Sequence, residues 1–121
     1  MSETVWFHFE SIKEYTLVHI GGILDTHGAA RLKEVVYTRL QEGESYFILD
    51  FEEVTDINST AIGSLIFLRR SIGMKKGRLK LIGLGKNVRY TFEVLDLHIM
   101  FSLYPNLEEA LIDETNEGED V

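Results

Sequence analysis

The chain opens with two short segments in which side chains of similar character recur at every second position. The segments span residues 5–10 and 15–20, and residues 11–14 lie between them. A period of two is typical of β-strands. We therefore predict a β-hairpin at the start of the chain.

A helical period follows the hairpin. Gly21-Gly22 interrupts the second strand, and Asp25 or Thr26 can cap the helix. Gly43 is a natural stop for it. The first predicted helix has apolar residues at helical spacing, namely Ala29, Leu32, Val36 and Leu40.

The middle of the chain combines a buried strand with a second helix. Residues 46–51 are almost continuously apolar, which predicts a central strand covered on at least one face. Residues 56–60 then supply capping side chains, and Gly73 and Gly77 surround the end of the helix. Its apolar residues are Ala61, Ile62, Leu65, Ile66, Leu68 and Ile72.

The last third of the chain continues the alternation. Residues 79–84 predict a strand, Asn87 a cap for a third helix, and residues 100–103 a short last strand. Asn106, after Pro105, can cap a final helix. The order ββαβαβαβα predicts a single α/β domain, with a mixed β-sheet, about four α-helices and right-handed crossovers.

Length and charge refine this interpretation. The 121 residues, 45% of them hydrophobic, suit one domain over residues 1–112. The formal net charge of −8 argues against nucleic acid and anionic membranes as partners. Residues 113–121 hold five of the acidic groups and no basic one, so we expect a disordered acidic tail. It is either a solubilising terminus or an acidic docking segment.

The sequence has neither a long uncharged apolar run nor a basic region ahead of an apolar stretch. We therefore expect no membrane insertion and no signal peptide. Cysteine is absent, which excludes disulfides and thiolate chemistry. These features favour a cytoplasmic location.

The common catalytic motifs fail on spacing. Residues 83–87 resemble a phosphate loop faintly, but Lys80 and Asn87 stand where a Walker A loop needs glycine and a hydroxyl residue. No serine lies in a Gly-x-Ser-x-Gly elbow. The histidines are scattered without metal-binding spacing, at positions His8, His19, His27 and His98. We predict neither an enzyme nor a bound cofactor or metal.

Residues 47–63 resemble the signature of STAS domains, in which a buried strand and a short turn lead to Asp-Ser-(Ser or Thr)-Gly-Leu-Gly at the start of a helix. The corresponding residues here are Asn58-Ser59-Thr60-Ala61-Ile62-Gly63. Further similar segments lie in the expected order along the chain, at residues 22–25, 77–83, 95–97 and 107–111.

This resemblance, to the anti-sigma-factor antagonist type in particular, implies a module that binds a partner kinase of the anti-sigma class. It implies phosphorylation at Ser59, followed by release, and reversal by a phosphatase. Asn58 replaces the usual aspartate and Ala61 the usual glycine. Asparagine can still cap the helix, and alanine suits its first turn.

The second helix has two stripes. One should be core: Ala61, Leu65, Leu68 and Ile72. The other stripe suits a docking face, and its residues are Ser59, Gly63, Phe67 and Arg70. We extend this docking face to Asp25, Asn58 and Thr60. Two alternatives stay open here: Phe67 packs against the neighbouring helix instead, and Asp25 is only a helix cap.

Two functions follow from these observations. The first is a phosphorylation-controlled binding module with Ser59 as its switch. In the second, Ser59 and Thr60 only cap the helix, and the chain is a constitutive STAS scaffold or a transporter-associated STAS component. The sequence assigns no oligomeric state.

Overall fold

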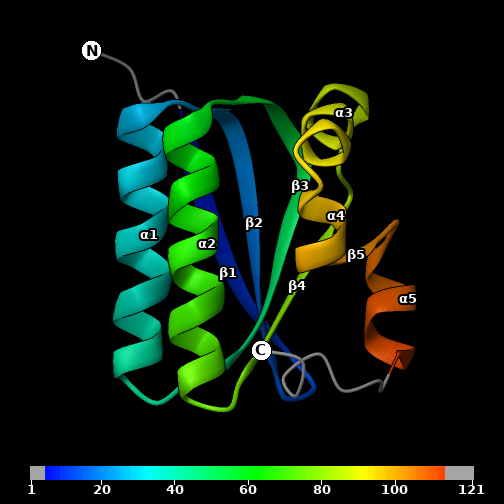
Figure 1. Cartoon of the computed structure of the whole chain (residues 1–121). Helices are drawn as coiled ribbons and strands as arrows, with labels where there is room; N and C mark the ends of the chain where they lie inside the picture. Colours follow the sequence, from blue (N-terminus) through cyan, green and yellow to red (C-terminus); the bar gives the residue numbers. More distant parts are fainter. Residues whose placement is uncertain (1–4, 114–121) are drawn as a thin grey trace.

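The computed structural model describes residues 5–113, which form a five-stranded sheet with helices on both faces (Figure 1). The elements are β1 (Val5–Ile12), β2 (Tyr15–Leu24), α1 (Thr26–Gln41), β3 (Tyr46–Ile57), α2 (Ser59–Met74), β4 (Arg78–Ile82), α3 (Lys86–Val94), α4 (Leu97–Met100), β5 (Ser102–Tyr104) and α5 (Leu107–Ile112). The strands lie in the order β1-β2-β3-β4-β5. Only β1 and β2 pair antiparallel, so the predicted mixed sheet is confirmed.

The predicted hairpin is present, and its second strand is longer than predicted. β2 continues through Gly21 and Gly22 to Leu24, because it pairs with β3 along this stretch with two irregularities in register. The ring of Trp6 lies where a Cβ at position 21 would stand, and Gly22 has a φ of +100°. The backbone at position 22 therefore favours glycine, whereas a side chain at position 21 would require the half-exposed Trp6 ring to move.

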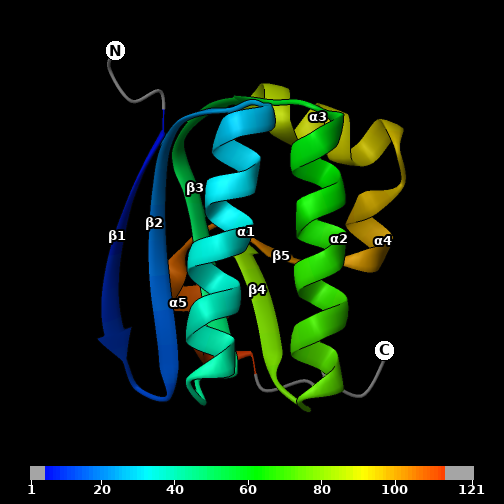
Figure 2. The ribbon, with the colours of Figure 1, turned by 90° about the vertical axis from the view of Figure 1, so that its left-hand side faces the viewer.

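Two layers of helices cover the sheet. α1 and α2 pack side by side on one face (Figure 2). The buried apolar residues of these two helices belong to one core, which also contains Val88 and Phe92 of α3. A smaller apolar cluster on the other face includes Leu17, Ile48 and Ala110 of α5. β2, β3 and β4 thus contribute alternate residues to the two clusters.

Several predicted boundaries were wrong, and the strand predicted over residues 79–84 ends at Ile82. α3 begins at Lys86 after Gly85, so Asn87 lies inside its first turn and is not its cap. The short helix α4 was missed, and it contains Met100, which was assigned to the last strand. β3 runs six residues beyond the apolar run, to Ile57. The observed order is therefore ββαβαβααβα.

The end of the described chain is anchored. Asp113, which we had placed in the tail, follows α5, its side chain accepts a hydrogen bond from Tyr104 Oη, and its carbonyl accepts one from Lys80 Nζ. The rest of the predicted tail lies outside the described residues. Across residues 5–113, we find no helix with the length and apolar character that a membrane crossing requires, and no cluster of potential metal ligands.

Candidate functional site

The helices α1 and α2 begin at the same edge of the sheet. β2 and β3 are parallel neighbours that end at Leu24 and Ile57, and the backbone N–H of Asn58 donates to Leu24 O at 3.2 Å. Each helix starts directly after its strand, so the two N-termini lie together at the carboxyl edge (Figure 1). This edge is where open α/β sheets commonly place their functional residues.

Both helices are capped by the side chains that the sequence indicated. Asp25 Oδ1 accepts from Gly28 N at 2.9 Å, and Asn58 Oδ1 accepts from Ala61 N at 3.0 Å. The Asn58 amide also donates to Thr26 Oγ1 at 3.4 Å. Asp25 is therefore the cap of α1. The next residue, Thr26, accepts the hydrogen bond from Asn58 and so joins the N-terminus of α1 to that of α2.

Ser59 is the first residue of α2, and its side chain is exposed. Because Asn58 is the cap of the helix, the Ser59 hydroxyl is not needed for capping. No acidic residue lies in the first turn. The hydroxyl thus stands in the positive field of the helix N-terminus, where an added anion is favoured.

Thr60 contributes to the contact between the helices. Its Oγ1 lies 3.3 Å from Thr26 Oγ1, and both residues are exposed. The sequence indicates Thr26 only as a possible helix cap. Its role as the link between the two N-termini depends on the pairing of β2 with β3, which no local pattern encodes.

The two stripes of α2 are arranged as predicted. The core stripe, Ala61, Leu65, Leu68 and Ile72, is fully buried. On the other stripe Gly63 is exposed, and a Cβ built there would meet nothing within 4 Å. A partner backbone could therefore approach α2 closely at this position.

Phe67 both packs against the neighbouring helix and contributes to the exposed face of α2. Its ring packs against Tyr37 of α1, with 5.5 Å between the centroids, and Lys33 Nζ lies 4.8 Å from its centre. It nevertheless keeps 40% of its surface exposed. It is thus a surface residue held in place by α1.

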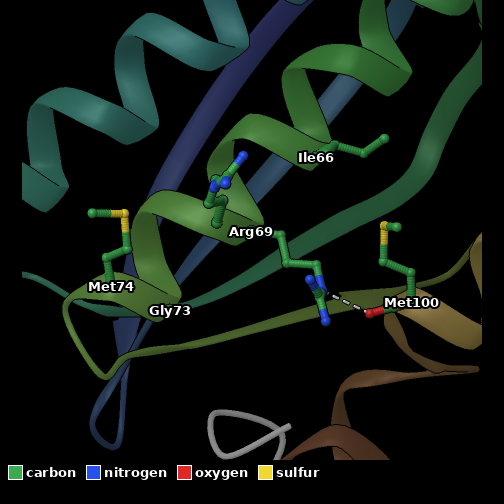
Figure 3. Close-up of a pocket in the computed structure, with 6 residues that line it drawn as sticks. Ile66, Arg69, Gly73, Met74 and Met100 are labelled. Carbon is green, nitrogen blue, oxygen red and sulfur yellow. Dashed lines mark hydrogen bonds between the residues drawn. The ribbon is translucent and has the colours of Figure 1, made fainter. Parts of the chain in front are cut away.

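Arg70 is exposed on the same stripe, but it does not join the cluster at the helix tip. Eleven residues of helix separate it from Ser59, which corresponds to about 16 Å along the axis. It is one of the residues that line a groove between α2 and α4. Figure 3 shows Arg69 and Met100 of the same groove. The predicted site residues therefore divide into a tip, formed by Asp25, Asn58, Ser59 and Thr60, and a stripe that descends from it.

One exposed apolar residue at this edge was missed. Ile23 is 44% exposed near the end of β2, where it pairs with Asp56. It adds apolar surface close to the capped N-termini. The sequence did not indicate this exposure, because the predicted strand ended at Ile20 and Ile23 lay outside it.

A family comparison covers the sheet and the start of both long helices. The family model for the STAS domain matches residues 8–110. This chain belongs to the STAS-domain family. The match includes the N-termini of α1 and α2, strands β2 to β5 and the second half of β1.

Relatives of this STAS domain include named regulators. The anti-sigma-B factor antagonist of Staphylococcus aureus (strain NCTC 8325 / PS 47) is 25% identical over 80 residues, which cover 66% of this chain and 74% of the relative. An anti-sigma factor antagonist from Mycobacterium paratuberculosis has the same fold, with a TM-score of 0.80 and 20% identity over 88% of this chain and 91% of that one.

The antagonist SpoIIAA also shares the fold, and it has been solved in two covalent states. Its unphosphorylated form gives a TM-score of 0.70 at 22% identity, covering 89% of this chain and 96% of that one. The phosphorylated form of the Bacillus protein gives 0.70 at 23% identity, with 89% and 97% covered. The two forms superpose equally well on this STAS domain.

Proposed function

We propose that this STAS domain is an anti-sigma-factor antagonist that binds an anti-sigma factor with kinase activity and is switched by phosphorylation of Ser59. A separate phosphatase restores the binding form. The module acts in the cytoplasm and catalyses nothing itself. The partner kinase binds the ATP that donates the phosphate, so the domain itself needs no cofactor.

The observation that carries the proposal is the division of labour at the start of α2. Asn58 caps the helix, and this leaves the exposed Ser59 hydroxyl available for modification. The similarity to the antagonist of Staphylococcus aureus and the fold shared with SpoIIAA supply the class of partner.

A phosphate on Ser59 would change binding more than folding. It adds about −1.5 to −2 charges at a helix end whose backbone N–H groups favour anions. A partner that buries this tip would remove water from the phosphate, and an acidic partner surface would also repel it. A loss of about 3 kcal/mol weakens binding roughly a hundredfold.

The constitutive scaffold or transporter-associated STAS component remains the competing function, and Asn58 is the residue that favours it. An aspartate could accept the same hydrogen bond from Ala61 N, so helix capping does not explain why this position holds asparagine in place of aspartate. The amide does allow donation to Thr26 Oγ1. Asn58 therefore stabilises the joint between the helices whether or not Ser59 is phosphorylated.

The test is incubation of the full chain with anti-sigma-type serine kinases from the same organism, Mg²⁺ and ATP, followed by intact-mass measurement. We expect the mass of one phosphate on the wild type and on Thr60→Ala, and none on Ser59→Ala. Thr60→Ala is the matched control, because it removes the neighbouring hydroxyl of the same turn.

A mass gain that persists in Ser59→Ala would overturn the assignment of the residue. No gain with any of the kinases, together with co-purification of a membrane transporter, would favour the scaffold.

A further inference from the structure

A second surface, separate from the helix tip, lies between α2 and α4. It is a groove of about 420 Å³ lined by Ile66, Arg69, Arg70, Gly73, Met74 and Met100 (Figure 3). We call it the α2–α4 groove. It begins two turns of helix beyond Ser59, so the proposed switch leaves it unexplained.

The groove combines apolar walls with positive charge. Met74 is 79% exposed, and Ile66 and Met100 are each more than a third exposed. Arg69 Nε donates to Met100 O at 2.8 Å, which ties α2 to α4 and leaves the other guanidinium donors for an anion. Arg70 is exposed beside it. Arginine and methionine are typical of binding surfaces.

The chain itself holds a segment of opposite charge. Residues 114–121 contain Glu114, Glu117, Glu119 and Asp120 and no basic residue, while the whole chain has a formal net charge of −8. Two adjacent arginines beside apolar side chains attract carboxylates. We propose that residues 114–121 dock in the α2–α4 groove of the same molecule.

The segment starts close enough to reach the groove. Lys80 Nζ donates to Asp113 O at 2.8 Å, and Lys80 pairs with Ser102, two residues after Met100. One strand spacing, one extended lysine side chain and two strand residues place Asp113 within about 20 Å of Met100. Eight extended residues span about 26 Å.

The route to the groove is short as well. β5 is an edge strand of only three residues, and both α4 and α5 contact it. A segment leaving α5 can therefore pass around this edge without crossing a folded element. Its distal carboxylates then meet Arg69 and Arg70. The docked segment would compete with any partner for the groove.

The absence of cysteine makes the proposal testable with a single label. Gly118→Cys places a nitroxide between two acidic residues and preserves every charge. In the ¹⁵N-labelled full chain we expect the amides of Gly73 and Met100 to lose most of their intensity. At 1 M salt, where screening acts within about 3 Å, we expect the intensity to return.

Two variants separate docking from chance contact. Arg70→Glu in the labelled chain should restore the Gly73 and Met100 amides, whereas Arg89→Glu on α3, the matched charge reversal, should not. Neutralising the segment with Glu117→Gln, Glu119→Gln and Asp120→Asn should restore them too. Unchanged amide positions elsewhere confirm that each variant is folded.

Other results would overturn the proposal. No loss at the groove amides, a loss on another face, or a loss unaffected by Arg70→Glu would exclude this docking site. A mixture of spin-labelled ¹⁴N protein with ¹⁵N protein that carries no spin label tests whether the docked segment comes from the same molecule or from a second copy. A loss that appears in this mixture would assign the groove to the segment of a second copy.

Discussion

At the scale of single residues, the start of α2 depends on an asparagine, a serine and a glycine with three different tasks. Asn58 satisfies a backbone N–H that the helix leaves open. Ser59 is exposed in the adjacent position, and Gly63 leaves open space one turn later. The tip is therefore stable without the serine hydroxyl, which is what a modifiable residue requires.

Removal of the cap should destabilise the domain. Asn58→Ala leaves Ala61 N without its acceptor, and the free energy of unfolding should fall by about 1 kcal/mol. Asn58→Asp is the matched control: it keeps the acceptor and loses only the 3.4 Å donation to Thr26 Oγ1, so its stability should lie closer to the wild type than that of Asn58→Ala. Urea denaturation followed by circular dichroism measures both. Equal stability of the alanine variant would show that the cap does not contribute.

Gly63 gives effects of opposite sign on stability and binding. Alanine fits the open space and is the better helix former, so Gly63→Ala should raise the free energy of unfolding by about 0.5–1 kcal/mol. Binding to the kinase partner should weaken, because the methyl group lies on the proposed docking face. Calorimetric titration with the partner, beside urea denaturation, checks both. Unchanged affinity would place the interface elsewhere.

At the scale of elements, the sequence predicted the pieces with a clear period and missed those that depend on distant partners. Both long helices and the hairpin follow from repeated apolar spacing. α4 has four residues, too few for a period, and β3 extends beyond its apolar run because β2 pairs with it there. The caps Asp25 and Asn58 were readable because capping is a local interaction. The Thr26–Thr60 contact joins residues 34 positions apart, so it was not.

The attachment of α5 is another such long-range feature. Lys80 is 1% exposed in a central strand, where its Nζ donates to Ala110 O and Asp113 O at the end of α5. It also lies about 5 Å from the ring centres of Tyr15 and Tyr104. This one ammonium group therefore holds the final helix against the second face of the sheet.

Replacement of that lysine should loosen α5 selectively. Lys80→Met keeps the apolar stem and leaves two carbonyls without their donor, at a cost of about 1–3 kcal/mol. Hydrogen exchange of the α5 amides should accelerate strongly, whereas the amides of α1 should keep most of their protection. Lys86→Met, on the exposed start of α3, is the control. Unchanged exchange in α5 would show that apolar packing alone holds the helix.

At the scale of the whole molecule, one histidine connects three strands. His19 Nε2 lies 2.8 Å from Glu10 Oε2 on β1, and its Nδ1 lies 2.8 Å from Asp50 Oδ2 on β3. The hydrogen bond with Glu10, assisted by Asp50, raises the pKa of His19 above 6.5 although partial burial opposes it. The same bond lowers the pKa of Glu10 below 4.5.

These shifts predict how stability depends on pH. The contribution of His19 is complete below pH 6.5 and is lost as the pH rises through its higher folded pKa. The contribution of Glu10 is complete above pH 4.5 and is lost as the pH falls through its lower folded pKa. The network therefore stabilises the sheet most between these two values.

Denaturation at a series of pH values checks this. The free energy of unfolding of the wild type should decline above pH 6.5, and His19→Gln should flatten that decline. His27→Gln, on the exposed first turn of α1, should leave it unchanged. A wild-type decline that survives in His19→Gln would assign it to other groups.

The most direct test of the account compares the affinity of the kinase partner for the two covalent states of the domain. Ser59-phosphorylated and unmodified protein are titrated against the partner, and thermal unfolding of both is recorded. We predict binding roughly a hundredfold weaker for the phosphorylated form, equivalent to about 3 kcal/mol, with an almost unchanged unfolding temperature. Equal affinities, or a phosphorylated domain that unfolds, would contradict the claim that Ser59 switches binding without disturbing the fold.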